Sequence, residues 1–358
     1  MRPRHLPRSL AHGLGICRPR SAAGVFALIL SAGAACSRAE AGDPDRASYP
    51  RYAELYTRPD STPFPAENPY TEARAHLGKV LFFDPRLSDS NILSCGSCHN
   101  PGFSWGDGLP RGVGHGMKTL DRRTPTILNA AWAEALFWDG RASTLEEQAL
   151  GPITSSAEMN MDEKRLVEKL RAIRGYQPLF EAAYPGEGIS PATVGKALAT
   201  YQRTIVSGTS PFDRWVSGDE GAISEEAKRG FELFNDKANC AACHSGWRFT
   251  DDSFHDIGVP GSDRGRGAVL DLDIVQFAFK TPTLRNVTER APYMHDGSEK
   301  TLEDVIELYD LGGRVKRASL SDEIRPLRLT SDEKRALVAY MRTLSSVDAP
   351  VDIPTFPY

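Results

Sequence analysis

The sequence has no long hydrophobic run. No stretch of 18 consecutive apolar residues occurs in its 358 residues, so no transmembrane helix is expected. Long alternating runs of β-branched residues, which would indicate a β-sheet protein, are also rare. Basic residues are not in excess, since 43 Lys and Arg stand against 47 Asp and Glu. The chain therefore has the composition of a globular protein, and its charge argues against a nucleic-acid partner.

The N-terminus resembles an export signal. Five arginines and no acidic residue precede a short apolar run over residues 22–35. The small residues at 39–41 fit a cleavage site, so the signal peptide would end at residue 41. Residues 33–36 equally fit a lipoprotein signal ending at residue 35, in which Cys36 carries the lipid. Both alternatives place the protein in the periplasm, and it would be attached to a membrane only if lipidated at Cys36.

Cysteine is scarce, and its placement is informative. Two of the six cysteines lie in the leader. The other four form two copies of one pattern, Cys95-Gly-Ser-Cys98-His99 and Cys240-Ala-Ala-Cys243-His244. Cys-x-x-Cys-His is the attachment sequence of c-type haem. Its cysteines lie on one face of a helical turn, where they can form thioethers to the two vinyl groups of a porphyrin. The adjacent histidine can then reach the iron as the proximal ligand.

Two alternatives exist for these four cysteines. They could form two disulfides in an oxidising compartment, or they could hold one zinc ion together. Neither alternative explains why a histidine follows each pair. The sequence therefore predicts two covalently bound haem c groups.

The chain also repeats itself, because three short motifs occur twice in the same order. They are GxxLFxD at 78–84 and 230–236, TPT at 124–126 and 281–283, and DGxxxTLE at 139–146 and 296–303. One haem motif lies within each set. Each half of the chain is therefore expected to form one haem domain with the same order of elements.

Apolar periodicity predicts helices in both halves. The predicted helices cover residues 71–83, 163–173, 192–205, 224–234 and 331–344. The expected fold class is mainly α, with two cytochrome c-like haem domains related by internal duplication. After the signal at 1–41, the N-terminal domain would cover 42–215 and the C-terminal domain 216–358.

The repeat allows the two irons to be compared. Tyr309 follows His295 by fourteen residues, and Pro152 follows Trp138 by the same interval. A phenolate can ligate iron, whereas proline has no side-chain donor. We therefore expect the second haem to be six-coordinate and the first to have an open distal side. One closed and one open iron in a single chain suggest a relay that feeds a reaction centre.

The sequence resembles the bacterial di-haem cytochrome c peroxidases and their MauG branch. The matching stretches are GVGHGMK, TPTILNA, FWDGRASTLEEQALGPI, EMN, CAACHSG, TPTLRNV and APYMHDG. In this family the distal ligand of the second haem is usually Met in true peroxidases and Tyr in MauG-like enzymes. Tyr309 falls at that position, so the resemblance is closer to the MauG branch.

This resemblance implies a function. The chain would be a di-haem oxidoreductase that activates hydrogen peroxide at the N-terminal haem. It would oxidise an aromatic residue of a periplasmic partner protein through a shared high-valent di-haem state, using the C-terminal haem for electron transfer. The alternative is a cytochrome c peroxidase that reduces hydrogen peroxide to water with electrons from a small cytochrome or cupredoxin. A plain electron-transfer cytochrome is less well supported, because such a carrier would be expected to close both irons.

The resemblance also implies roles for side chains near the first haem. Trp138 would lie between the two haems and couple the irons. Glu158 would act as the acid/base that moves a proton between the two peroxide oxygens. Gln148 would orient the peroxide by hydrogen bonding, and Pro152 would line the same distal pocket.

Two further features stay open at this point. His115 is either a removable sixth ligand of the first iron or a histidine of the pocket or surface. The resemblance also implies a calcium ion between the haem domains, held by the backbone carbonyls of Arg290 and Pro292 and by an asparagine side chain. Arg123 occupies the position of that asparagine, which puts calcium in doubt.

We predict that the protein, produced in a host that matures c-type cytochromes, carries two haems attached through Cys95/Cys98 and Cys240/Cys243. Mass spectrometry of the intact chain should show two added haem masses. A mass that corresponds to bound zinc or to two disulfides would contradict the assignment of both motifs.

Overall fold

The computed structural model describes residues 49–358, so the expected export signal lies outside the described residues. Within the described part, no helix has the length and apolar character needed to cross a bilayer. The expected mainly α class is confirmed, because β-strands among these residues are limited to one short antiparallel pair. They are β1 (Phe254–His255) and β2 (Phe279–Lys280).

All five predicted helices are present. They are α2 (Glu72–Phe83), α5 (Glu163–Ala172), α7 (Pro191–Arg203), α9 (Glu225–Asn235) and α12 (Ser331–Arg342). Each begins after a residue whose side-chain oxygen accepts a hydrogen bond from the backbone of the first turn, namely Thr71, Asp162, Ser190, Ser224 and Thr330. Such caps contribute about 1 kcal/mol each, which explains why the sequence located the helix starts well.

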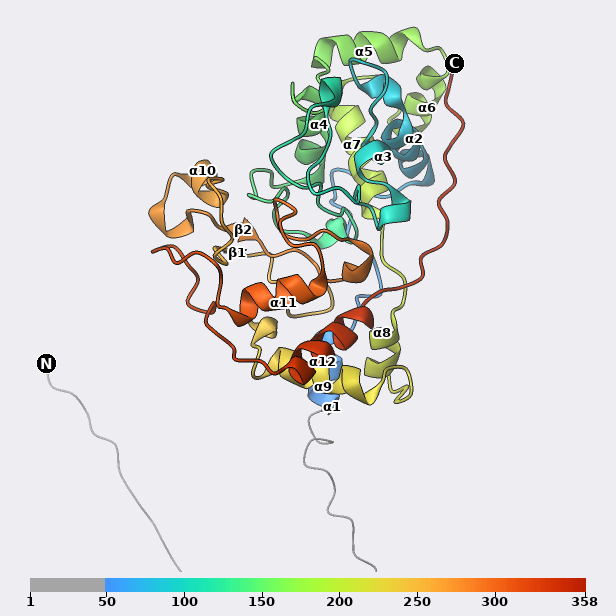
Figure 1. Cartoon of the computed structure of the whole chain (residues 1–358). Coiled ribbons are helices and arrows are strands. Elements are labelled where there is room, and N and C mark those ends of the chain that lie inside the picture. The colour runs from blue at the N-terminus through green and yellow to red at the C-terminus, as the bar shows by residue number, and fades with distance from the viewer. Residues whose placement is uncertain (1–48) are drawn as a thin grey trace, which may run out of the picture. The chain divides into compact units, whose positions relative to one another are not determined.

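The remaining α-helices have ten residues or fewer. They are α1 (Tyr49–Tyr56), α3 (Cys95–Cys98), α4 (Leu145–Thr154), α6 (Tyr176–Ala183), α8 (Pro211–Val216), α10 (Arg266–Leu270) and α11 (Leu302–Asp310). In Figure 1, α2 to α7 gather in the upper part of the view, and α8, α9, α11 and α12 gather with α1 below them.

Each half is built on one pair of closely crossing helices, α2 with α7 and α9 with α12. A Cβ atom added to Gly78 would lie 2.0 Å from the backbone oxygen of Ala197, and one added to Gly230 would lie 2.0 Å from that of Ala336. The backbones therefore touch at equivalent points in both halves. This contact explains the glycine that opens the repeated GxxLFxD motif.

The described residues form two main hydrophobic cores, and the two ends of the described segment each pack against the core of the opposite half. The first core centres on α2 and α7, and the second on α9 and α12. Tyr56 of α1 is buried in the second core, whereas Val351 and Phe356 of the C-terminal tail pack against the first. Figure 1 shows this tail, in red, running from α12 toward α6, where the Tyr358 carbonyl accepts a hydrogen bond from the Gly175 backbone at 3.0 Å.

The domain boundary expected between residues 215 and 216 stays a prediction. Phe212 and Trp215 of α8 belong to the second core. This packing favours a division before Pro211 over one at the end of α8.

The duplication extends to loop geometry. Asn129 and Asn286 occupy equivalent positions, both in the left-handed region with φ of 60° and 54°. Their side-chain oxygens accept hydrogen bonds from the backbone of Ser207 and Ser346 at 3.0 and 2.9 Å. The two halves therefore share detailed backbone turns as well as helices.

We predict that Gly230→Ala destabilises the holoprotein by about 1–3 kcal/mol, the usual cost of overpacking. An alanine in an unobstructed helix would instead be stabilising relative to glycine. Denaturant unfolding followed by circular dichroism measures the difference. Gly221→Ala serves as the control, because its nearest neighbour would be the Asp219 carboxylate at 3.7 Å. Equal stability of the two variants would contradict the close crossing.

Candidate active site

The first haem motif borders a cavity of about 1030 Å³. This volume is at the upper end of the range that is usual for ligand and cofactor sites. Cys95, Cys98 and His99 line the cavity. The two cysteines lie on the single turn of α3, which begins with a reciprocal capping box between Ser94 and Ser97. His99 follows at the end of that turn, and its backbone N–H donates to the Cys95 carbonyl at 2.8 Å. Local capping therefore presents all three haem-attachment residues to one cavity.

The two motif histidines are oriented alike. The Nδ1 atom of His99 lies 3.2 Å from the carbonyl oxygen of Trp105, and that of His244 lies 2.9 Å from that of Phe249. A proton on Nδ1 leaves Nε2 as the nitrogen that can bind a metal. Burial lowers the pKa of both histidines, which keeps the rings neutral as ligation requires.

The thiols also fit a covalent porphyrin. All four are free of disulfides. Burial raises the pKa of Cys95 to about 12 and that of Cys240 to about 12, so these apolar surroundings favour neutral sulfur, the state of a thioether. The two pairs line different cavities, so a zinc site shared by the four cysteines is wrong.

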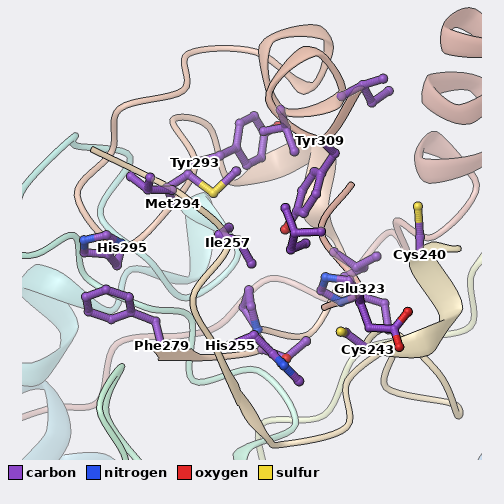
Figure 2. A pocket seen from close by; sticks show the side chains of 18 of the residues that line it. Cys240, Cys243, His255, Ile257, Phe279, Tyr293, Met294, His295, Tyr309 and Glu323 are labelled. Atoms are coloured by element: carbon purple, nitrogen blue, oxygen red, sulfur yellow. The ribbon is translucent and has the colours of Figure 1, made fainter. Parts of the chain in front are cut away.

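The second cavity is smaller, about 200 Å³, and is lined by Cys240, Cys243, His244 and Tyr309. Figure 2 shows Tyr309 projecting from α11 toward the middle of the cavity, with the two cysteines on one side and Met294 on the other. The Tyr309 hydroxyl has no hydrogen-bond partner among residues 49–358. Burial raises the pKa of Tyr309, so its phenol stays neutral unless a cation lowers the pKa again.

The same local signal positions Pro152 and Tyr309. Thr144 caps the start of α4 and Thr301 caps the start of α11, in both cases through the threonine of the repeated TLE motif. Pro152 then lies in the last turn of α4 and lines the first cavity. Tyr309 lies at the equivalent point of α11. The duplicated helix thus presents a side chain without a donor to one cavity and a phenol to the other.

The structure brings together the other residues expected near the first haem. Gln148, Glu158 and Trp138 line the cavity that contains His99. The Glu158 carboxylate forms no hydrogen bond with residues 49–358, and burial raises its pKa, partly opposed by Arg141. A carboxyl group of this kind can gain or lose a proton near neutral pH more readily than an exposed one.

His115 is placed differently. It is absent from the residues that line the first cavity. Its Nε2 atom lies 3.4 Å from the Asn160 amide nitrogen, and its backbone N–H donates to the Ala157 carbonyl at 3.0 Å. This geometry gives no support to a ligand role, which stays a prediction.

Trp138 lines both cavities. Its indole N–H donates to the Arg123 carbonyl at 2.8 Å, and its ring meets that of His295 edge-on at 6.5 Å between centroids. His295 in turn stacks on Phe279 at 3.6 Å. An indole therefore lies between the two sites in a fixed orientation, where the resemblance leads one to expect it.

The segment that holds Trp138 is bound across the junction by a reciprocal pair of hydrogen bonds. The Arg123 N–H donates to the His295 carbonyl at 2.7 Å, and the Lys280 N–H donates to the Trp138 carbonyl at 2.8 Å. Arg123 and Lys280 both directly precede a TPT motif, and Trp138 and His295 both directly precede a DG pair. Equivalent residues of the two halves thus exchange equivalent bonds.

Sequence reasoning missed the charged contacts beside this pair. Arg122 bridges the two halves by pairing with Asp139 and with Asp263, each at 2.6 Å. Arg266 donates to the Gly140 carbonyl at 2.6 Å. Their positions next to repeated motifs were the one available signal, because the contacts of Arg122 with Asp263 and of Arg266 with Gly140 each join residues more than a hundred positions apart.

Comparison with known proteins agrees with this geometry. The profile described as "Di-haem cytochrome c peroxidase" matches residues 72–221, and the profile described as "Cytochrome c" matches 227–345. The methylamine utilization protein MauG of Methylorubrum extorquens is 49% identical, over 98% of both chains. The chain belongs to the di-haem cytochrome c peroxidase and MauG family.

More distant members of the family are also similar to this chain over most of its length. The cytochrome c551 peroxidase of Pseudomonas aeruginosa is 36% identical, over 81% of this chain and 83% of the peroxidase. The crystal structure of a MauG-like protein associated with microbial copper homeostasis is 32% identical with a TM-score of 0.75, covering 81% of this chain and 93% of that one. The chain is therefore a haem-dependent oxidoreductase, and haem c is its cofactor.

We predict that Glu158→Gln slows the reaction with peroxide by about 10²–10⁴-fold without loss of either haem. Because burial raises the Glu158 pKa, the wild-type rate should rise with pH through an inflection above the usual glutamate range, as the base form appears. That inflection should disappear in the variant.

Stopped-flow absorbance across a pH series measures both effects. Glu147→Gln is the matched control, because Glu147 is exposed and pairs with Ser143 outside the cavity. An unchanged rate in Glu158→Gln would remove this residue from the mechanism.

Proposed function

We propose that the protein uses hydrogen peroxide at its N-terminal haem to oxidise an aromatic side chain of a partner protein. The N-terminal domain, expected within 42–215, is the site of peroxide reaction, and the C-terminal domain, within 216–358, holds the electron-transfer haem. The two electrons that convert peroxide and two protons to two waters come from the partner side chain.

One observation carries this proposal. Pro152 and Tyr309 lie at equivalent points of α4 and α11, and each lines the cavity of its own half. Pro152 offers no donor, so it would leave an iron held by His99 accessible to a small ligand such as peroxide. Tyr309 offers a phenol oxygen to the second cavity, so it would close an iron held by His244. Met294 also lines the second cavity and is the competing donor.

Bound haem iron supplies the site for peroxide and the redox chemistry. The side chains of the chain supply proton transfer and orientation. Glu158 takes the proton from one peroxide oxygen and returns it to the other, a shift that its raised pKa makes easier near neutral pH. Gln148 orients the peroxide on the same side. Trp138, fixed through Arg123 and His295, provides an aromatic bridge between the two sites.

The 49% identity to a MauG over nearly the whole chain supports a protein partner. An oxygen ligand from Tyr309 stabilises higher oxidation states of iron than a Met sulfur does. Such a ligand suits an enzyme that holds oxidising equivalents until a partner docks. The export signal expected at the N-terminus supports a periplasmic location for this chain, and the partner would then be a periplasmic protein.

The second candidate function is that of a peroxidase supplied with electrons by a small cytochrome or cupredoxin. The similarity to the cytochrome c551 peroxidase and the presence of Met294 in the second cavity favour it. In that case one haem would have to be reduced before peroxide reacts, and His115 would be the controlling ligand.

We predict that the fully oxidised protein reacts with peroxide without prior reduction. Tyr309→Met should raise the reduction potential of the second haem, by on the order of 100 mV, because a sulfur ligand favours ferrous iron. Met294→Leu is the matched control and should leave the potential unchanged. Spectroelectrochemical titration measures the potentials, and stopped-flow absorbance measures the peroxide reaction. An oxidised enzyme that is inert until one haem is reduced would establish the peroxidase function instead.

A further inference from the structure

The side chain of Arg123 is buried at the junction between the two haem sites, with 5% of its surface exposed. Its guanidinium donates to the backbone carbonyl of Arg290 at 2.6 Å, a contact between residues 167 positions apart. The carbonyl of Arg290 is one of the two that the family resemblance assigns to calcium. In this chain that oxygen already accepts a hydrogen bond from a guanidinium.

A second buried cation lies beside the first. Arg290 is 6% exposed, and its guanidinium donates to the carbonyls of Thr283 at 2.6 Å and Asn286 at 3.2 Å. Within residues 49–358, no carboxylate forms an ion pair with either arginine. Burial lowers the pKa of Arg290, and the charge of Arg123 lowers it further.

This donor set does not fit calcium. Calcium takes six to eight oxygen ligands, usually including carboxylates. Here the side chain at the asparagine position is a cation, and an added divalent ion would lie next to two buried guanidinium groups. Like charges at such short range in a buried setting repel strongly.

We propose that the guanidinium of Arg123 takes the place of a structural metal ion at this junction, so that the two haem domains are held together without calcium. The same residue binds both halves through its backbone, since its N–H donates to His295 and its carbonyl accepts the indole N–H of Trp138. Arg123 is thus a positioning residue for Trp138. This inference concerns the junction and holds whichever reaction the haems perform.

The test measures calcium content and thermal stability of the holoprotein. Purified wild type is passed through gel filtration, analysed for calcium by inductively coupled plasma mass spectrometry, and melted with EGTA or with added calcium chloride. We expect no calcium at stoichiometric level and no shift of Tm between the two conditions. Stoichiometric calcium in the wild type, or a Tm that falls by several degrees in EGTA, would overturn the proposal.

Substitutions of Arg123 distinguish metal replacement from packing, because only metal replacement predicts that the Tm of a variant responds to calcium. Arg123→Asn restores a side-chain oxygen and removes the charge, so its Tm should fall in EGTA and rise by several degrees with added calcium, as a ligand that binds the folded state requires. Arg123→Lys keeps the charge and should remain insensitive to calcium.

Arg171→Asn is the matched control, because Arg171 also donates to a backbone carbonyl, that of Ile189 at 3.0 Å, but far from the junction. It should be insensitive to calcium. If Arg123→Asn folds and its Tm does not respond to calcium, the site never had a metal to replace and the proposal fails. If that variant does not fold, the calcium content and EGTA response of the wild type decide the question alone.

Discussion

The two hydrogen bonds that Arg123 and Lys280 donate to His295 and Trp138 hold the two halves of this protein in register. Each bond contributes only about 1 kcal/mol by itself. Their importance is geometric, because both ends of both bonds are backbone atoms next to repeated motifs. Once they form, the indole of Trp138 is placed against both cavities. The salt bridges of Arg122 with Asp139 and Asp263 strengthen the same contact.

A duplicated fold with this kind of junction starts from two equivalent sites, and single side chains make the sites different. The helices α4 and α11 begin with the same threonine cap, yet the last turn of one carries Pro152 and that of the other carries Tyr309. The position before the DG pair carries an indole in one half and an imidazole in the other, and these two rings meet. The repeated backbone thus provides two equivalent haem sites, and individual side chains give these sites different properties.

Neutral side chains are expected to contact the haems, whereas buried positive charge lies at the junction between the two haem sites. The residues expected to contact haem or peroxide are partly buried and favour their neutral forms, as the lowered pKa of His99 and His244 and the raised pKa of Glu158 indicate. Positive charge with no carboxylate partner among the described residues lies at the junction, on Arg123 and Arg290. A neutral pocket beside a cationic junction suits a porphyrin, which is apolar over most of its surface and carries its carboxylates at one edge.

The sequence by itself determined the features that depend on near neighbours. The haem motifs, the repeated motifs and five helices with their caps involve residues within a few positions of one another, so the pattern contains the whole interaction. The equivalence of Pro152 and Tyr309 also followed from spacing, because the same capped helix precedes both. Only the tertiary structure decided which distant residues meet. The burial of Tyr56 in the second core, the contact of Trp138 with His295, the position of His115 beside Asn160 and the bond from Arg123 to Arg290 each join segments that no local pattern relates. Such contacts depend on how the packed halves fit together, and that fit is a property of the folded chain as a whole.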